Sequence, residues 1–500
     1  AVADVPIAAG GLFQEDIIAR FSGNRSAGIP RAFEQKRRLV ARGSRARMPW
    51  LARIGGVTYR VVLKVVDTNA LHGAASYKGI ATTAGVELES KSLMHELKGA
   101  NGRPLIEQMD EAYFSHPDEF DKYALGDLQV HAILAANAVQ ARKLYDAMDM
   151  GEFYTPPALS IGSTVARFCQ ARLAKYFGMP PDIMESSRTR NEFLQQLVCT
   201  ASADHLRRQV HTKLALLAKI EGGLCRSKRP TSAVFRGNLI DLDIGGAYGN
   251  RLSVMVFPVG EPILETFVNG NSERGIPLRL WLRDRRRRLF PGVWMARIST
   301  RKRLAYDQDM FLSYFGQKNE VEYDPDRDGY EALLDVTSGY SKSLAREVYQ
   351  GALDAVLLEI VEKVWSPAQR EDFLDCTEVL VSGYYPSDLL ITDKDEWLAL
   401  ADKETRTKAE RHCWHAIPYG PLIVDVLLTL RASYGKNTPE NLFTKLFINT
   451  IYGVSVSRFF ESSNMIFGGN VTSAVRGIMW LTEKGLNLHG SITDGQVFNP

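Results

Sequence analysis

The sequence predicts a mixed α/β fold in two or more domains. A chain of 500 residues, 45% hydrophobic and 24% charged, has a globular composition and is longer than one hydrophobic core usually organises. An alternating apolar run from Asn238 to Asp243, followed by glycines, is typical of a strand that ends in a turn. The stretch 439–452 instead has the signals of a helix with one polar face.

The helix predicted over 439–452 has signals at both ends. Thr438 can cap its start, Pro439 fits the first helical position, and Gly453 fits the position just past its end. Three polar side chains share one face of this helix: Lys445, Asn449 and Tyr452. Such a face could hold a triphosphate and a flat base or sugar. The alternative is an amphipathic helix with a solvated lysine and a Tyr-Gly end.

The strand that ends at Asp243 could supply metal ligands. A carboxylate at a strand end, with the carbonyl of Ile244 beside it, offers the oxygen ligands that Mg²⁺ prefers. Tyr248, five residues on, could pack under the sugar of a nucleotide. The alternative is an ordinary strand and turn, in which the glycines serve only the turn.

A hairpin is predicted over 488–498, with Asp494-Gly495 at its turn. It would place a second carboxylate on a tight turn. Two carboxylates that hold two Mg²⁺ ions can stabilise the attacking and leaving oxygens of phosphoryl transfer. Many Asp-Gly hairpins carry no chemistry, so the prediction depends on the agreement of all three motifs.

The three motifs resemble the palm and fingers motifs of family B DNA polymerases. The lysine helix fits Lys-x-x-x-Asn-Ser-x-Tyr-Gly at every position except Thr450. In Asp-x-x-Ser-Leu-Tyr-Pro, Asp243 and Tyr248 match, and three other positions depart: Gly246, Ala247 and Gly249. In Asp-Thr-Asp-Ser, two positions match and two depart: Thr493 and Asp494 match, Ile492 replaces the first acid, and Gly495 replaces the serine.

The resemblance implies a template-directed DNA polymerase that uses dNTPs. Asp243 and Asp494 would be catalytic and, with the Ile244 carbonyl, would hold two Mg²⁺ ions, for which Mn²⁺ could substitute. The nucleotide would be bound by Tyr248, Lys445, Asn449, Tyr452 and Arg431. Arg431 would lie on a fingers helix expected over 404–431, which also carries Lys408 and Arg411. The missing first acid at Ile492 would affect metal affinity or rate and not the fold.

Further segments resemble the protein-primed, or primer-independent, branch of the family. Glu221-Gly222-Gly223 resembles a Tyr-x-Gly-Gly element, and 470–477 resembles the helix that precedes the last motif. Basic clusters at 25–53 and 283–303 suggest phosphate contacts. The DNA-binding residues would be Gly222, Gly223, Arg286, Arg287 and Arg476. The partners would be a DNA template with a primer or a priming protein.

The N-terminal part is expected to be a degenerate or truncated ribonuclease-H-like exonuclease. Val57–Val66 is predicted as a strand ending at Asp67, and 77–91 as a helix and turn. Tyr123 and Asp127 resemble the third exonuclease motif, whereas no first motif, Asp-x-Glu, is found before residue 67. The predicted division is a basic segment at 1–56, the exonuclease-like domain at 57–214, and palm and fingers at 215–500 with an insertion around 260–400.

Other observations concern the cellular location of the protein and its further domains. Five scattered cysteines indicate reduced thiols, and the longest apolar stretch, 422–430, is too short to span a membrane. We therefore expect a protein of the cytoplasm, at a nucleoid or viral replication site, with an organelle as the alternative. The chain ends directly after the last motif, so a thumb is expected beyond it or on another subunit.

Three other functions are compatible with these motifs. A reverse transcriptase requires paired aspartates in the last motif, where this sequence has Ile492 and Asp494. A catalytically weakened, polymerase-like scaffold would bind DNA without copying it. An unrelated nucleotide-binding protein is disfavoured, because the sequence has no Gly-Lys-Ser/Thr phosphate loop.

Overall fold

The computed structural model describes residues 2–9, 45–54, 57–67, 77–88, 92–126, 129–158, 160–227, 238–268, 274–284, 286, 293–313, 345–486 and 488–498. The chain forms two compact units. The first contains Ala1–Lys175 and Val426–Ile451, and the second contains Tyr176–Asp425 and Tyr452–Pro500. The structure mixes helices and sheets, as predicted.

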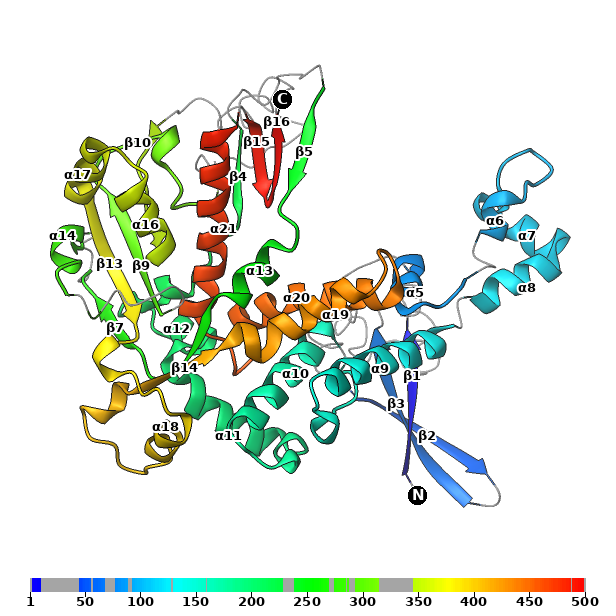
Figure 1. The fold of residues 1–500 in the computed structure, drawn as a ribbon. Helices are drawn as coiled ribbons and strands as arrows, with labels where there is room; N and C mark the ends of the chain where they lie inside the picture. The colour runs from blue at the N-terminus through cyan, green and yellow to red at the C-terminus, as the bar shows by residue number, and fades with distance from the viewer. Residues whose placement is uncertain are drawn as a thin grey trace. The chain divides into compact units, whose positions relative to one another are not determined.

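The first unit contains a three-stranded sheet near the N-terminus (Figure 1). Its strands are β1 (Val2–Ala9), β2 (Arg45–Ile54) and β3 (Val57–Asp67). The central strand β3 pairs parallel to β1 and antiparallel to β2. The strand predicted over 57–66 and ending at Asp67 is therefore confirmed.

The rest of the first unit is helical. Its helices are α5 (Tyr77–Ala84), α6 (Leu93–Glu96), α7 (Met109–Ser115), α8 (Pro117–Gly126), α9 (Val130–Ala147), and most of α10 (Ile161–Tyr176), α19 (Asp425–Ser433) and α20 (Pro439–Val456). Aromatic rings join three of them. Tyr145 of α9 meets Phe168 of α10 edge to face at 5.1 Å, and Phe168 meets Phe447 of α20 at 5.0 Å.

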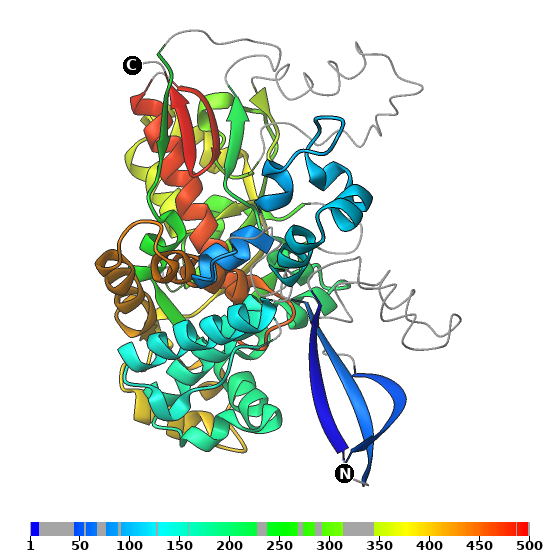
Figure 2. The ribbon, with the colours of Figure 1, turned by 90° about the vertical axis from the view of Figure 1, so that its right-hand side faces the viewer.

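The second unit is built around helix α21 (Met465–Gly485), which contacts two sheets (Figures 1 and 2). The first sheet has strand order β12-β9-β13-β7, with β8 paired to β13: β7 (Ile263–Thr266), β8 (Ile276–Pro277), β9 (Trp294–Thr300), β12 (Gly351–Leu353) and β13 (Thr377–Tyr384). The second has order β4-β15-β16-β5: β4 (Leu224–Ser227), β5 (Ile240–Asp243), β15 (Leu488–Thr493) and β16 (Gly495–Phe498).

Shorter elements complete the second unit. Two further strand pairs are β6 (Val256–Gly260) with β14 (Trp414–Pro418), and β10 (Leu304–Ala305) with β11 (Ala345–Arg346). The remaining α-helices are α11 (Ser187–Val198), α12 (Ala203–Arg208), α13 (Ala247–Ser253), α14 (Leu278–Trp281), α16 (Ala355–Lys363), α17 (Pro367–Cys376) and α18 (Lys394–Ala401).

Small residues and a polar cap explain the position of α21. The Asn464 side chain caps its start by accepting hydrogen bonds from the backbone N–H groups of Ile466 and Phe467, both at 3.1 Å. A Cβ at Gly469 would lie 2.5 Å from Met295 Sδ, and one at Gly477 would lie 2.8 Å from Ile360 Cδ1. Glycine therefore allows β9 and α16 to approach, and sixteen of the 21 residues of α21 are buried.

Two helix predictions need correction. Thr438 caps α20 as expected, since its Oγ1 accepts a hydrogen bond from Asn441 N at 3.3 Å, but the helix continues past Gly453 to Val456. The helix expected over 404–431 is wrong. That stretch contains β14, a π-helical turn at Gly420–Val424, and α19 only from Asp425. The pairing of β14 with β6 buries Trp414 and Ile417, which outweighs local helix propensity.

No helix in the described ranges combines the length and the apolar character needed to cross a lipid bilayer.

Candidate active site

The two candidate acids lie on neighbouring strands of the four-stranded sheet. Asp243 is the last residue of β5, and the antiparallel register pairs it with Gly495, the first residue of β16. The backbone N–H of Ile244 donates to the carbonyl of Asp494 at 2.9 Å. The fold therefore brings together two residues that are far apart in the sequence.

At β15 and β16, one face of this sheet is covered and the other is open. Ser491 and Gln496 are 1% and 2% exposed, and the Gln496 side chain donates to the carbonyl of Met479 on α21 at 2.8 Å. Because side chains alternate along a strand, Ile492 takes the opposite face, where it is 74% exposed. The register places Ile492, Gly495 and Asp243 in one row on that open face.

The Asp494 turn has an unusual backbone. Thr493 has a φ of 59°, so a non-glycine residue adopts the left-handed conformation, while Gly495 is not among the described residues with positive φ. The turn is also tightly packed, because a Cβ at Gly223 would lie 2.6 Å from the Cα of Thr493.

Tyr248 lies beside this turn and stacks on another predicted site residue. Its ring and that of Tyr452 have centroids 5.0 Å apart and planes inclined by 23°. Burial raises the pKa of Tyr248, and the neighbouring Asp494 charge adds to this effect. Burial and the proximity of Tyr248 raise the pKa of Tyr452 to about 12, against a hydrogen bond with Thr472. Tyr248 and Asp494 are therefore electrostatic neighbours.

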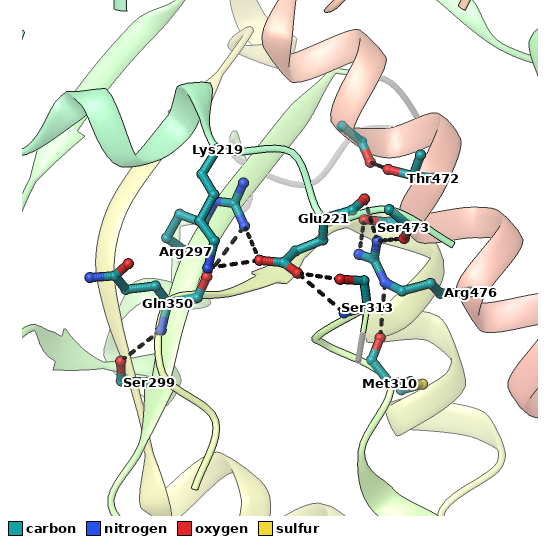
Figure 3. A network of polar contacts seen from close by, with 12 residues as sticks. Lys219, Glu221, Arg297, Ser299, Met310, Ser313, Gln350, Thr472, Ser473 and Arg476 are labelled. Carbon is teal, nitrogen blue, oxygen red and sulfur yellow. Dashed lines mark hydrogen bonds and ion pairs between the residues drawn. The ribbon is translucent and has the colours of Figure 1, made fainter. Parts of the chain in front are cut away.

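The predicted DNA contact Arg476 instead lies in a buried polar network (Figure 3). Its Nη1 donates to the backbone carbonyls of Glu221 at 2.8 Å and Gly222 at 2.7 Å. Its Nε donates to the Met310 carbonyl at 3.3 Å, and Nη2 donates to Ser473 Oγ at 2.9 Å. With no exposed surface and four protein acceptors, Arg476 has a structural role in place of the predicted DNA contact.

Glu221 anchors the same network from the other side. Its carboxylate accepts hydrogen bonds from Ser313 N at 3.2 Å and Ser313 Oγ at 3.1 Å, and lies 2.9 Å from Lys219 Nζ (Figure 3). Burial acts to raise the pKa of Glu221, but Lys219, Arg297 and Ser313 together hold it below its usual value. Arg297 is itself fully buried, which lowers its pKa to about 10.

The candidate metal ligands fit Mg²⁺ only together with a substrate. No group of three or more His, Cys, Asp or Glu side chains among the described residues is placed to hold a metal. The carbonyl of Ile244 already accepts a hydrogen bond from Ala247 N at 3.2 Å. Magnesium in nucleotide-processing enzymes is commonly held by one or two carboxylates plus substrate phosphates, so Asp243 and Asp494 match that incomplete set.

Three predicted nucleotide-binding residues belong to the first unit. Lys445 and Asn449 are exposed, and the helical period of α20 puts them on one face with Tyr452. Arg431 lies in the last turn of α19, where its carbonyl accepts a hydrogen bond from Asn441 Nδ2 at 3.0 Å.

The exonuclease-like residues that the structure describes lie on different elements. Asp67 ends β3, and Tyr123 lies on α8, where it packs against a small core formed by Met94, Leu105 and Ala112. Asp127 lies outside the described residues. For Tyr123, the described packing is that of an ordinary core aromatic.

The basic cluster at 283–303 is partly neutralised by nearby acids. Arg286 pairs with Asp284, its Nη2 lying 2.8 Å from Oδ2. Lys302 pairs with Asp372 at 2.6 Å, and Arg301 pairs with Glu378. Arg287 lies outside the described residues. Lys302 and Asp372 are both exposed, and an exposed pair of this kind contributes little to stability, so a phosphate can compete for the lysine.

The sequence interpretation missed polar residues that support the site. Thr472 bonds to Tyr452, and Ser473 accepts from Arg476, both from α21. Three closely spaced polar residues within an otherwise apolar helix, Asn470, Thr472 and Ser473, are the signal that could have identified them. All three are at most 1% exposed.

Comparisons with known proteins found a likeness among solved structures. No protein-family model and no curated protein matches the chain. It is similar to solved structures of Phi29 DNA polymerase: the ternary complex with primer-template DNA and incoming nucleotides (12% identity, 89% of this chain, 63% of that chain, TM-score 0.44), and the complex with single-stranded DNA (12%, 91%, 62%, TM-score 0.43). The chain thus spans less than two thirds of those proteins. At these values, the assignment of function depends on the residues themselves.

Proposed function

We propose that the protein is a template-directed DNA polymerase of the family B type. The observation that supports this proposal best is the pairing of β5 with β16, which brings Asp243 next to the turn that carries Asp494. The stacked pair of Tyr248 and Tyr452 next to that edge supports it further.

Asp243, Asp494 and the Ile244 carbonyl would hold two Mg²⁺ ions, or Mn²⁺ in their place. When bound, these ions neutralise charge on the transferring phosphate. The exposed position of Asp243 and the half-buried position of Asp494 leave both carboxylates accessible to a triphosphate. Tyr248 would pack under the incoming sugar and exclude a 2′-hydroxyl.

Lys445, Asn449 and Arg431 would bind the nucleotide, with Lys445 neutralising the triphosphate. Their part in the proposal comes from the sequence motif and from the shared face of α20. A fixed positive charge that acts on the phosphates stabilises the transition state more than the ground state.

The partners would be a DNA template and either a primer or a priming protein that offers a hydroxyl. Arg286 and Arg287 would contact the DNA backbone. The protein would act at a nucleoid or viral replication site. The exonuclease-like part, with Asp67, Tyr123 and Asp127, would be inactive or weak.

A primer-extension assay tests the proposal. The full chain is incubated with primer-template DNA, Mg²⁺ and single dNTPs, with four templates that differ only in the first templating base. We expect incorporation of the complementary nucleotide and no incorporation without Mg²⁺. Lys445→Ala should raise KM for dNTP and lower kcat with DNA affinity nearly unchanged. Lys436→Ala, an exposed lysine before α20, is the matched control.

A second function is favoured by one observation. Ile492 replaces an acid of the resembled motif and lies 74% exposed in the same row as Asp243. This replacement suits a DNA-binding scaffold with weakened catalysis. Specific DNA binding without any incorporation, in Mg²⁺ or Mn²⁺, would favour the scaffold over the polymerase.

A further inference from the structure

The two glycines after Glu221 have different surroundings. A Cβ at Gly223 would lie 2.6 Å from the Cα and 2.7 Å from the Cγ2 of Thr493. A Cβ at Gly222 would meet only the Cβ of Ser313, at an ordinary 3.9 Å. Neither glycine has a positive φ, so the contact, and not the backbone conformation, requires glycine at 223. Gly223 therefore supports the residue that precedes Asp494.

The segment 221–223 is itself held rigidly. Arg476 donates to the carbonyls of Glu221 and Gly222, and the Glu221 carboxylate is fixed by Ser313. Arg476 comes from α21, which also holds β16 through Gln496. Strand β4 begins directly after Gly223 and pairs Leu224 with Thr493. One helix thus fixes β16 and the segment that leads into β4, which are the two strands on either side of β15.

We propose that Arg476 and Gly223 are positioning residues that set the place of the Asp494 carboxylate through Thr493. This inference rests on the proposed function only for its catalytic consequence, because the packing itself is independent of the reaction. It also gives the Gly-Gly element a role that differs from the predicted DNA contact.

A buried arginine is a costly way to gain stability alone. Its desolvation is offset only where all its donors are satisfied, and apolar residues of similar volume are often as stable. Arg476 donates two of its hydrogen bonds to two consecutive carbonyls of one short segment. This arrangement fixes a backbone position that an apolar side chain would leave undetermined.

The test compares Gly223→Ala with Gly222→Ala in the full chain. Hydrogen–deuterium exchange of segment 488–498 reports on the turn without any ligand. We expect faster exchange in Gly223→Ala and wild-type exchange in Gly222→Ala. In primer extension, Gly223→Ala should lower kcat and raise the Mg²⁺ requirement by about 10- to 100-fold, with KM for dNTP nearly unchanged. Gly222→Ala should stay within about twofold.

Arg476→Lys provides the second variant, since one ammonium can replace some of the hydrogen bonds. It should show a smaller change in the same direction, whereas Arg476→Met should match Gly223→Ala. Equal exchange or equal kcat in the two glycine variants would overturn the inference. If the wild type incorporates no nucleotide, the proposed polymerase function fails, and the exchange comparison alone decides whether Gly223 and Arg476 position the turn.

Discussion

The two large sheets of the second unit share helix α21 but differ in exposure. In the five-stranded sheet, all eight residues of β13 and six of the seven residues of β9 are buried. In the four-stranded sheet, every residue of β5 is exposed, and Ile492 on β15 is 74% exposed. One sheet therefore provides the core, and the other is held in place by its inner face alone. Asp243 lies on the uncovered face, and Asp494 lies in the turn at the end of the same sheet.

Within the second unit, one sheet therefore contributes mainly to stability and the other mainly to the proposed chemistry. Substitutions in the five-stranded sheet should change folding, whereas substitutions on the open face of the four-stranded sheet should change activity. The following predictions, from the largest expected effect to the smallest, would break or sharpen that contrast.

The largest effect is expected for Asp494→Asn and Asp243→Asn. Loss of a carboxylate that holds the metal should lower kcat for dNTP incorporation at least about 1000-fold, or about 4 kcal/mol. The melting temperature should change little, because neither residue is fully buried. Glu359→Gln, an exposed carboxylate on α16, is the control. Full activity in either aspartate variant would contradict the proposed site.

Matched isoleucines test the contrast in stability. Ile298 of β9 is fully buried, so Ile298→Ala should lower the free energy of unfolding by about 2–5 kcal/mol. Ile492→Ala, at an exposed position, should change it by less than about 0.5 kcal/mol. Urea denaturation measures both. Similar losses in the two variants would show that the open face is covered in solution.

A buried carboxylate at the start of α16, a helix that packs against α21, predicts that the free energy of unfolding depends on pH. Asp354 caps α16 and is fully buried, and desolvation raises its pKa from 3.8 to about 6. The folded state therefore binds this proton more tightly than the unfolded state. The stabilisation is fully present below pH 3.8 and is lost as pH rises through about 6. The stabilisation lost between these two pH values corresponds to about 3 kcal/mol.

Asp354→Asn should remove this dependence while keeping the helix cap. Relative to the wild type, the variant should gain stability between pH 4.5 and pH 8. Unfolding free energies at several pH values measure the difference. A difference that does not vary with pH would mean that Asp354 is ionised in the folded protein throughout the range.

The smallest effect is expected for sugar selection. Tyr248→Ala should lower the ratio of dNTP to rNTP incorporation efficiency by about tenfold or more, because the ring would no longer exclude a 2′-hydroxyl. Tyr452→Phe keeps the stacked ring while removing its hydroxyl, so it should leave the ratio nearly unchanged. An unchanged ratio in Tyr248→Ala would make Tyr248 a packing residue.

The sequence predicted local features well and long-range features less well. The strand end at Asp243 and the hairpin around Asp494 follow from alternation and from Asp-Gly, which are local signals. The pairing of β5 with β16 could be expected only from the resemblance of the whole motif set. The helix over 404–431 failed because the partner of β14 lies about 150 residues earlier in the chain, at β6.

Arg476 shows why the role of a charged residue is hard to predict from sequence. An arginine is usually exposed, so a basic residue near the expected site suggests a phosphate contact. Three of its four acceptors are the backbone carbonyls of 221, 222 and 310, and the residue types at these positions do not indicate that their carbonyls bind an arginine. The contact between Gly223 and Thr493 is hidden for the same reason, because it depends on tertiary packing.

Among the described strands, β5 lies at the edge of its sheet, and this position affects how the protein would behave in solution. A strand at a sheet edge offers unpaired backbone groups to other molecules, and Ile240 and Leu242 on β5 are 39% and 42% exposed. Asp241 and Asp243 alternate with them. Negative charges on an edge strand repel a second copy of the same edge. The carboxylate proposed to bind metal would thus also keep the protein from self-association.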